Sequence, residues 1–166
     1  MTDPFEPPEL TRERAEVLLE RLAVDRYGAE LIGADGPGWI DARSSAGDPL
    51  ELKACALRIR DGSSRRRGRW LIRRESHETL LRERGRYLLG VYDARPEIVA
   101  IANVPAERVD RALEGCSWFE CRSSDRGGDA TQLTHSEVFP ELDQRLTDPV
   151  PSRSLFTDLS PESSSP

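Results

Sequence analysis

The chain has 166 residues, of which 37% are hydrophobic and 33% charged, so it is long enough for one polar globular domain with its own core. No apolar run approaches the roughly 20 residues of a membrane span, and the N-terminal stretch MTDPFEPPEL lacks the basic start and apolar segment of a signal peptide. Three cysteines, an odd number, fit a reducing cytoplasm better than a disulfide framework.

The first half of the chain is expected to form an arm, a helix and then strands. Residues 1–10 hold three prolines and are expected to be a flexible arm. From Thr11, which can serve as an N-cap, apolar residues recur at helical spacing until Gly28, and this predicts a helix. Strands are expected at 39–43, 50–60 and 69–72. The last two strands, joined by a Gly- and Ser-containing loop, predict a hairpin over residues 50–73.

The second half alternates helices and strands and ends in a Pro- and Ser-rich tail. Helices are expected at 75–85 and 106–115, and strands at 86–93, 97–105 and 130–139, the last running into a short helical turn. This order predicts one α/β domain, a mixed sandwich built on one sheet, over residues 11–146. The tail from about Thr147 is expected to be disordered.

Three apolar residues interrupt the polar tail, Leu155, Phe156 and Leu159. Isolated apolar groups in a disordered segment can dock on a partner protein. The alternative is a hydrophobic remnant without a role.

The strand at 50–60 alternates in a way that changes along its length. Leu50 and Leu52 share one face while Glu51 and Lys53 share the other, but Leu57 then places an apolar side chain on the odd-numbered face. A slip of one residue exchanges the faces of a strand, so a bulge or bend is expected near residues 54–56.

Charge is distributed unevenly, and lysine is almost absent. The whole chain carries −6, but residues 56–90 hold 11 Arg and 4 acidic residues, a net charge of +7. Acidic, arginine-rich and lysine-poor proteins resemble those of salt-adapted archaea, in which acidity serves solubility and says little about partners. The basic third is either a solvated arginine-rich face or a surface that binds phosphates.

The only lysine, Lys53, lies two residues after Glu51, on the strand that follows Asp41. Side chains two apart on a strand project from the same face, so these three groups can meet across two adjacent strands. Mg²⁺ takes one or two carboxylates with water and substrate oxygens, polarises a phosphate and acidifies a water. A compact ammonium beside that water can orient it, a place that a forked guanidinium cannot readily fill.

The stretch GWIDARSSAGDPLELKAC resembles the metal-dependent PD-(D/E)XK phosphodiesterase superfamily, which includes restriction endonucleases and archaeal Holliday-junction resolvases. The order of predicted elements over residues 11–104 is similar to the αβββαβ core of that superfamily, and Ile40 stands where its motif has proline. The resemblance implies that Asp41 and Glu51, helped by the Leu52 carbonyl, bind Mg²⁺ or Mn²⁺, and that Lys53 orients the attacking water.

Two further points concern the same site. Some members of the superfamily add a glutamate from the first helix, and Glu16, which borders the apolar stripe, is the candidate for that role, whereas Glu13 and Glu20 point further into solvent. The alternative for Glu51 and Lys53 is a surface ion pair without catalytic use, worth at most about 1 kcal/mol.

The basic hairpin is the candidate DNA-binding surface. Its arginines, with two that follow it, are Arg58, Arg60, Arg65, Arg66, Arg67, Arg69, Arg73 and Arg74. A β-hairpin is narrow enough to enter a DNA groove, and contacts to phosphates are expected because no base-reading pattern is evident.

Other candidate residues give weaker signals. Trp70 is expected in the core, and His77 is expected to be a solvated helix residue, with contact to a phosphate as the alternative. Cys116, Cys121 and His135 lack the tight ligand pairs of a zinc site. Cys55 is expected to be a small buried filler.

Two functions remain open on the sequence. The first is a metal-dependent DNA endonuclease in the cytoplasm, for which cleavage of both strands would favour a homodimer. The second is a non-catalytic DNA-binding module on the same fold. The presence of Asp41, Glu51 and Lys53 together favours the first.

Overall fold

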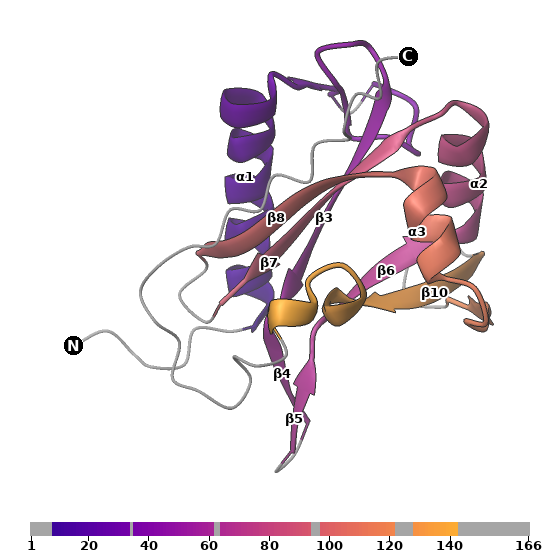
Figure 1. Ribbon diagram of the computed structural model, residues 1–166. Coiled ribbons are helices and arrows are strands. Elements are labelled where there is room, and N and C mark those ends of the chain that lie inside the picture. The colour runs from indigo at the N-terminus through magenta and orange to yellow at the C-terminus, as the bar shows by residue number, and fades with distance from the viewer. Residues whose placement is uncertain (1–7, 34, 62–63, 94–96, 122–127, 143–166) are drawn as a thin grey trace.

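The computed structural model describes residues 8–33, 35–61, 64–93, 97–121 and 128–142. A mixed five-stranded sheet runs through it in the order β1-β2-β3-β7-β8 (Figure 1). Its strands are β1 (Glu30–Leu31), β2 (Ala42–Arg43), β3 (Pro49–Ala56), β7 (Arg86–Tyr92) and β8 (Ile98–Pro105). β3 and β7 are parallel and the other neighbours are antiparallel. The sheet is flanked by helices, which confirms the predicted α/β restriction-endonuclease-like fold.

Helix α1 (Pro8–Tyr27) covers one face of this sheet (Figure 1). Small and aliphatic residues of the helix, Ala15, Leu19 and Ala23, are buried against Leu50 and Leu88 of the sheet. At Gly90 of β7 an added Cβ would lie 2.9 Å from a Leu19 methyl group, so the glycine lets the helix approach closely. This first core fixes α1 along β3.

The second face carries a larger core and more elements. Helices α2 (Arg74–Arg82) and α3 (Ala106–Ala112) lie on this side with a three-stranded sheet of β6 (Arg69–Arg73), β10 (Asp129–Thr134) and β9 (Phe119–Glu120). The short helix η1 (His135–Glu137) follows β10. Trp70 and Phe139 pack together in this core, and the Trp70 indole donates to the Gly90 carbonyl at 3.0 Å. Trp70 is therefore a core residue, as predicted.

The predicted hairpin over residues 50–73 is wrong in its pairing. β3 pairs with β2 and β7, and β6 pairs with β10, so residues 50–60 and 69–72 are not partners. A smaller hairpin of β4 (Arg58–Asp61) and β5 (Ser64–Arg67) forms a separate two-stranded sheet that extends beyond the end of β3 (Figure 1). The domain is accordingly built on more than one sheet.

Of the predicted bulge or bend near residues 54–56, the structure shows a bend, one residue further on at Leu57, and no bulge. The register of β3 with β7 is continuous from Leu50 opposite Arg86 to Ala56 opposite Tyr92, and the chain bends at Leu57. Apolar side chains occur on both faces of this strand because both faces of β3 are covered by other parts of the protein. Cys55 lies in the second core, while Leu52 and Ala54 pack against the first.

The start of helix α1 differs from the sequence prediction. Helix α1 begins at Pro8, so Thr11 lies inside the helix and is not its N-cap. Residues 1–7 of the predicted arm and the predicted tail with Leu155, Phe156 and Leu159 lie outside the described residues. Among the helices that the structure describes, none has the length and apolar character needed to cross a membrane.

Candidate active site

Asp41 lies one residue before β2, at the edge of the sheet where β2 stops pairing with β3. Its N–H donates to the Leu50 carbonyl at 3.1 Å, which continues the contact between the two strands. Its side-chain Oδ2 accepts a hydrogen bond from the Leu52 N–H at 2.8 Å. The Asp41 carboxylate thus accepts the hydrogen bond from the Leu52 N–H that a backbone carbonyl would accept if β2 were longer.

Glu51 and Lys53 lie on β3 two residues apart and meet on one face of it. Lys53 Nζ is 2.9 Å from Glu51 Oε1, and the two side chains are only 24% and 10% exposed. The pair is therefore largely removed from water, unlike the exposed ion pair that the sequence left open as an alternative. A buried carboxylate is costly without a partner, and the ammonium of Lys53 supplies one.

These groups line one hollow of about 220 Å³ at the edge of the sheet. Its walls are formed by residues of α1, the start of β2 and β3: Glu16, Leu19, Glu20, Asp41, Glu51, Leu52, Lys53 and Ala54. Asp41, Glu51, Lys53 and Glu16, which the sequence analysis singled out, therefore line the same hollow. Glu20, which was expected further into solvent, lines the hollow too.

The donor set of the hollow suits a hard cation with a partly aqueous shell. Asp41 and Glu51 provide carboxylate oxygens, and the Leu52 backbone carbonyl is a third donor of the kind that Mg²⁺ accepts. Within the part of the chain that the structure describes, no group of three or more His, Cys, Asp or Glu side chains gathers closely enough to hold a metal. Glu16 instead pairs with Arg12 at 3.7 Å, on the exposed side of α1.

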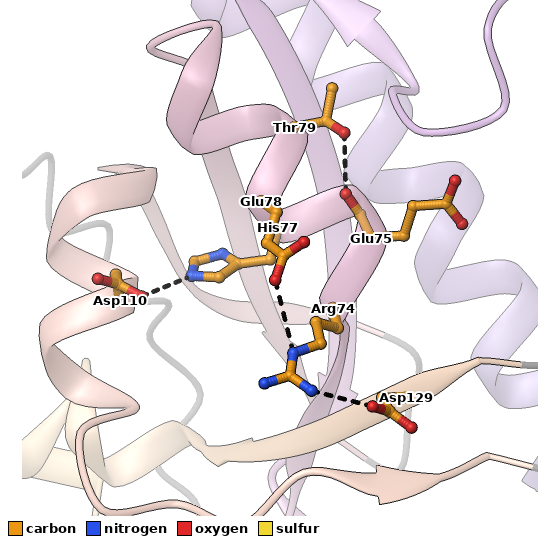
Figure 2. A network of polar contacts seen from close by, with 7 residues as sticks. All are labelled: Arg74, Glu75, His77, Glu78, Thr79, Asp110 and Asp129. Carbon is orange, nitrogen blue, oxygen red and sulfur yellow. Dashed lines mark hydrogen bonds and ion pairs between the residues drawn. The ribbon is translucent and has the colours of Figure 1, made fainter.

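A buried polar network next to Glu51 was missed by the sequence analysis. His77 of α2 is 2% exposed, so the expectation of a solvated residue is wrong. Its Nδ1 lies 2.9 Å from the Tyr87 hydroxyl and its Nε2 lies 3.2 Å from Asp110 Oδ1 (Figure 2 shows the pair with Asp110). Tyr87 stands opposite Glu51 in the β3–β7 register. Burial raises the pKa of Tyr87, and the charges on Glu51 and Asp110 raise it further.

The structure places the arginines of the basic segment in two groups. On the hairpin the register sets Arg58 opposite Arg67 and Arg60 opposite Arg65, and Arg66 and Arg67 are exposed. Like charges directly opposite each other destabilise a strand pair, and a two-stranded sheet has little stability to spare. Asp61 is the single acidic residue of the segment 58–67.

The second group of arginines lies on β6 and α2, where partners within the protein hold two of them. Arg69 donates to Gln132 at 2.9 Å. Arg74 pairs with Asp129 at 3.0 Å and Glu78 at 3.5 Å and stacks on Trp118 (Figure 2 shows both acids). Arg73, half-buried, is the last residue of β6. Five of the eight predicted DNA-binding arginines thus lie on the separate two-stranded sheet of β4 and β5.

Of the remaining cysteine and histidine candidates, three are buried and one is exposed. His135 is buried and its Nε2 donates to the Leu57 carbonyl at 2.9 Å. Cys116 is exposed, whereas Cys121 and Cys55 are buried, the latter as predicted. Burial raises the pKa of the Cys55 thiol, which makes it a poor nucleophile.

A mixed sheet covered by helices, with an Asp and a Glu-x-Lys pair beside an open strand edge, is the arrangement of the PD-(D/E)XK fold that the sequence resembles. A family model described as a PD-(D/E)XK nuclease superfamily domain matches residues 8–140, and the chain belongs to that superfamily. A comparison with curated proteins finds no match.

Proposed function

We propose that the protein is a metal-dependent DNA endonuclease whose active site is the hollow at the edge of β3. The observation that carries this proposal is the meeting of Asp41, Glu51 and Lys53 in one hollow, with Glu51 and Lys53 largely buried. A merely solubilising ion pair has no need of burial, whereas a reactive site gains from it because electrostatic interactions strengthen as water is excluded.

Each residue has a distinct role in the proposed reaction. Asp41, Glu51 and the Leu52 carbonyl would hold Mg²⁺ or Mn²⁺, with Glu16 as a further, outer acid. The bound metal would polarise the phosphate and acidify a water. The Lys53 ammonium would orient that water towards the phosphorus and stabilise the charge that develops there. The Leu52 N–H keeps the Asp41 carboxylate turned towards the strand edge.

DNA would be held chiefly by the arginine hairpin, through phosphate oxygens. Arg58, Arg60, Arg65, Arg66 and Arg67 lie on its two strands, and Arg69, Arg73 and Arg74 extend the basic segment on β6 and α2. Arginine guanidinium groups donate charge-assisted hydrogen bonds to phosphate oxygens, which suits this basic segment to a nucleic-acid backbone. Cleavage of both strands would favour a homodimer.

The decisive experiment compares cleavage with binding in Lys53 variants. Junction, flap and duplex DNA are incubated with Mg²⁺ at low and high salt, and binding is measured separately in EDTA. Lys53→Ala should bind about as well as the wild type and cut at least about 100-fold more slowly, because the ammonium acts only in the transition state. Lys53→Arg should restore little, since a guanidinium is forked and planar. Wild-type protein that binds these substrates but cuts none would favour the non-catalytic DNA-binding module instead.

A second experiment locates the DNA surface. Replacing three arginines, Arg65, Arg66 and Arg67, by Gln should flatten the dependence of log K on log salt by about 2–3 units, because each lost phosphate contact removes nearly one released counterion. The matched control replaces Arg14, Arg21 and Arg108, at exposed positions of α1 and α3. An unchanged slope in the hairpin variant would place the DNA surface elsewhere.

A further inference from the structure

Helix α1 packs one side against the sheet and carries two exposed valines on the other side. The helix lies on the outside of the five-stranded sheet (Figure 1). Val17 is 50% exposed and Val24 is 41% exposed, whereas Leu19 between them is buried. At about 100° per residue, Val17 lies about 160° around the helix from Leu19, and Val24 about 140°. The core between α1 and the sheet therefore makes no use of the two valines.

The valines belong to a repeat of seven residues. The stretches ERAEV (13–17) and ERLAV (20–24) each place a glutamate four residues and an arginine three residues before a valine. Residues seven apart lie along one line of a helix, and this spacing is the repeat by which two helices pack along their length. Valine also lowers helix propensity, so an exposed helix position normally holds a better helix former. One exposed valine would need no explanation, but two at this spacing indicate a line of contact.

Opposite charges border this valine line, which consists of Val17 and Val24. Glu20 lies about 60° to one side of Val17 and Arg21 about 40° to the other side, because they follow it by three and four residues. Glu13 and Arg14 repeat the arrangement seven residues earlier, and all four charged residues are exposed. The valine line thus has an acidic flank, Glu13 and Glu20, and a basic flank, Arg14 and Arg21. The two flanks are complementary to each other in charge.

A second copy of α1 satisfies both flanks in one orientation. When two identical helices run parallel about a two-fold axis, the acidic flank of each faces the basic flank of the other. In an antiparallel pair each flank faces its own kind, and like charges repel. β-branched residues on the central line also favour parallel pairs of two helices. The charge pattern therefore fits a second copy of this chain with its α1 parallel to the first.

We propose that the protein forms a two-fold symmetric dimer through the outer side of α1, in which Val17 and Val24 of the two copies pack together. Each copy contributes two valines and the stems of four charged side chains, so the interface is small and the dimer forms at micromolar concentration. Glu20 belongs to the acidic flank and also lines the hollow of the candidate active site. The basic flank of the second copy therefore lies beside that hollow. The proposal rests on α1 alone and goes beyond the proposed function, which favours a homodimer without assigning it a surface.

Sedimentation equilibrium of the full chain, without DNA or metal, tests the dimer. The wild type should show a reversible equilibrium between monomer and dimer with a Kd of about 10–100 μM. Val17→Ala combined with Val24→Ala should raise the Kd at least about 10-fold. The melting temperature of this variant at about 1 μM protein, where both proteins are monomeric, should not fall, because alanine is the better helix former. The control is Leu31→Ala, which shortens another exposed apolar side chain outside α1 and should leave the Kd unchanged.

Reversing the charge of one flank tests the complementarity. Glu13→Arg combined with Glu20→Arg makes both flanks basic, and Arg14→Glu combined with Arg21→Glu makes both acidic. Each protein alone should stay monomeric, and a mixture of the two should dimerise at least as strongly as the wild type, because opposite flanks then meet again. Two variants that each dimerise like the wild type would refute the role of the flanks.

A cross-link tests the orientation. In a chain that also carries Cys116→Ser, which removes the exposed thiol, Val24→Cys should form a disulfide-linked dimer on mild oxidation, because the two copies of this position face each other in a parallel pair. A cross-link that forms only between Val17→Cys and Val24→Cys proteins would refute the parallel arrangement. A wild type that stays monomeric at about 300 μM would refute the interface, since a contact of this kind requires dimers there. So would a Kd that Val17→Ala with Val24→Ala leaves unchanged. None of these measurements involves cleavage, so they stand or fall separately from the proposed function.

Discussion

Removing the Tyr87 hydroxyl tests how much the buried network beside Glu51 stabilises the fold. Asp110 can only accept, so in the neutral ring of His77 the proton lies on Nε2, and Nδ1 accepts from the Tyr87 hydroxyl. Tyr87→Phe therefore deletes one buried hydrogen bond, worth about 0.5–1.5 kcal/mol, and leaves Nδ1 of a 2% exposed histidine without its partner. A loss of about 1–3 kcal/mol is expected, which lowers the melting temperature by about 3–10 °C.

The measurement is equilibrium unfolding in urea at pH 7, with a second tyrosine of the chain as control. Tyr92 is also buried in the sheet, but within the described residues its hydroxyl has no hydrogen bond, so Tyr92→Phe should change the free energy of unfolding by less than about 0.5 kcal/mol. Equal losses in the two variants would refute the account of the network. So would a Tyr87→Phe protein as stable as the wild type.

The pH dependence of the free energy of unfolding in alkaline solution is a second measurement on Tyr87→Phe. The folded pKa of Tyr87 is raised, so its contribution is fully present below the unfolded value of about 10 and is lost as pH rises above that value. The wild type should lose about 1.4 kcal/mol per pH unit there through this group, and Tyr87→Phe should not. The difference between the two proteins should thus shrink between pH 10 and 11. A constant difference would mean that the hydroxyl titrates normally in the fold.

Two further predictions concern packing and thiol chemistry. Gly68→Ala should lower the free energy of unfolding, measured in urea, by about 1–3 kcal/mol, because the added Cβ would collide with the Ala56 backbone. Gly33→Ala should leave it nearly unchanged, because the space around Gly33 is open. Equal losses in the two variants would contradict the packing. N-ethylmaleimide at pH 7.5 should modify the exposed Cys116 within minutes. Cys55 should stay unmodified until the protein unfolds, because it is buried and burial raises the pKa of its thiol. Peptide mass spectrometry distinguishes the two cysteines, and equal rates of modification would contradict the burial of Cys55.

Local patterns predicted the elements well and the pairing of strands poorly. The spacing of Glu51 and Lys53 predicted that both side chains project from one face of a strand, because side-chain direction along a strand repeats every two residues, and they form an ion pair on β3. The partner of a strand is set by non-local packing. β3 pairs with β7 across an intervening hairpin, strand and helix, and β6 pairs with β10, more than 50 residues away in sequence. No periodicity within β3 or β6 contains that information.

His77 shows the same limit for a single side chain. Its position in the polar stretch ESHETLL favoured solvent, and only the packing of α2 against β7 and α3 puts its ring between Tyr87 and Asp110. A signal was present in the amphipathic spacing of His77 with Leu80 and Leu81, which places the histidine on the apolar side of the helix. Sequence alone could not say which polar groups would face it there.

The early end of β2 has a consequence for self-association. Beyond Leu50 the outer edge of β3 has no strand beside it among the described residues, and an open edge of this kind can recruit a strand from another molecule. The Asp41 carboxylate blocks that recruitment at its first free amide, the N–H of Leu52. Truncating Asp41 to alanine would uncover the edge as well as remove a proposed metal ligand, and aggregation could then be mistaken for loss of the proposed catalysis. Asp41→Asn keeps an acceptor for the Leu52 amide and is the variant from which a loss of cleavage can be interpreted.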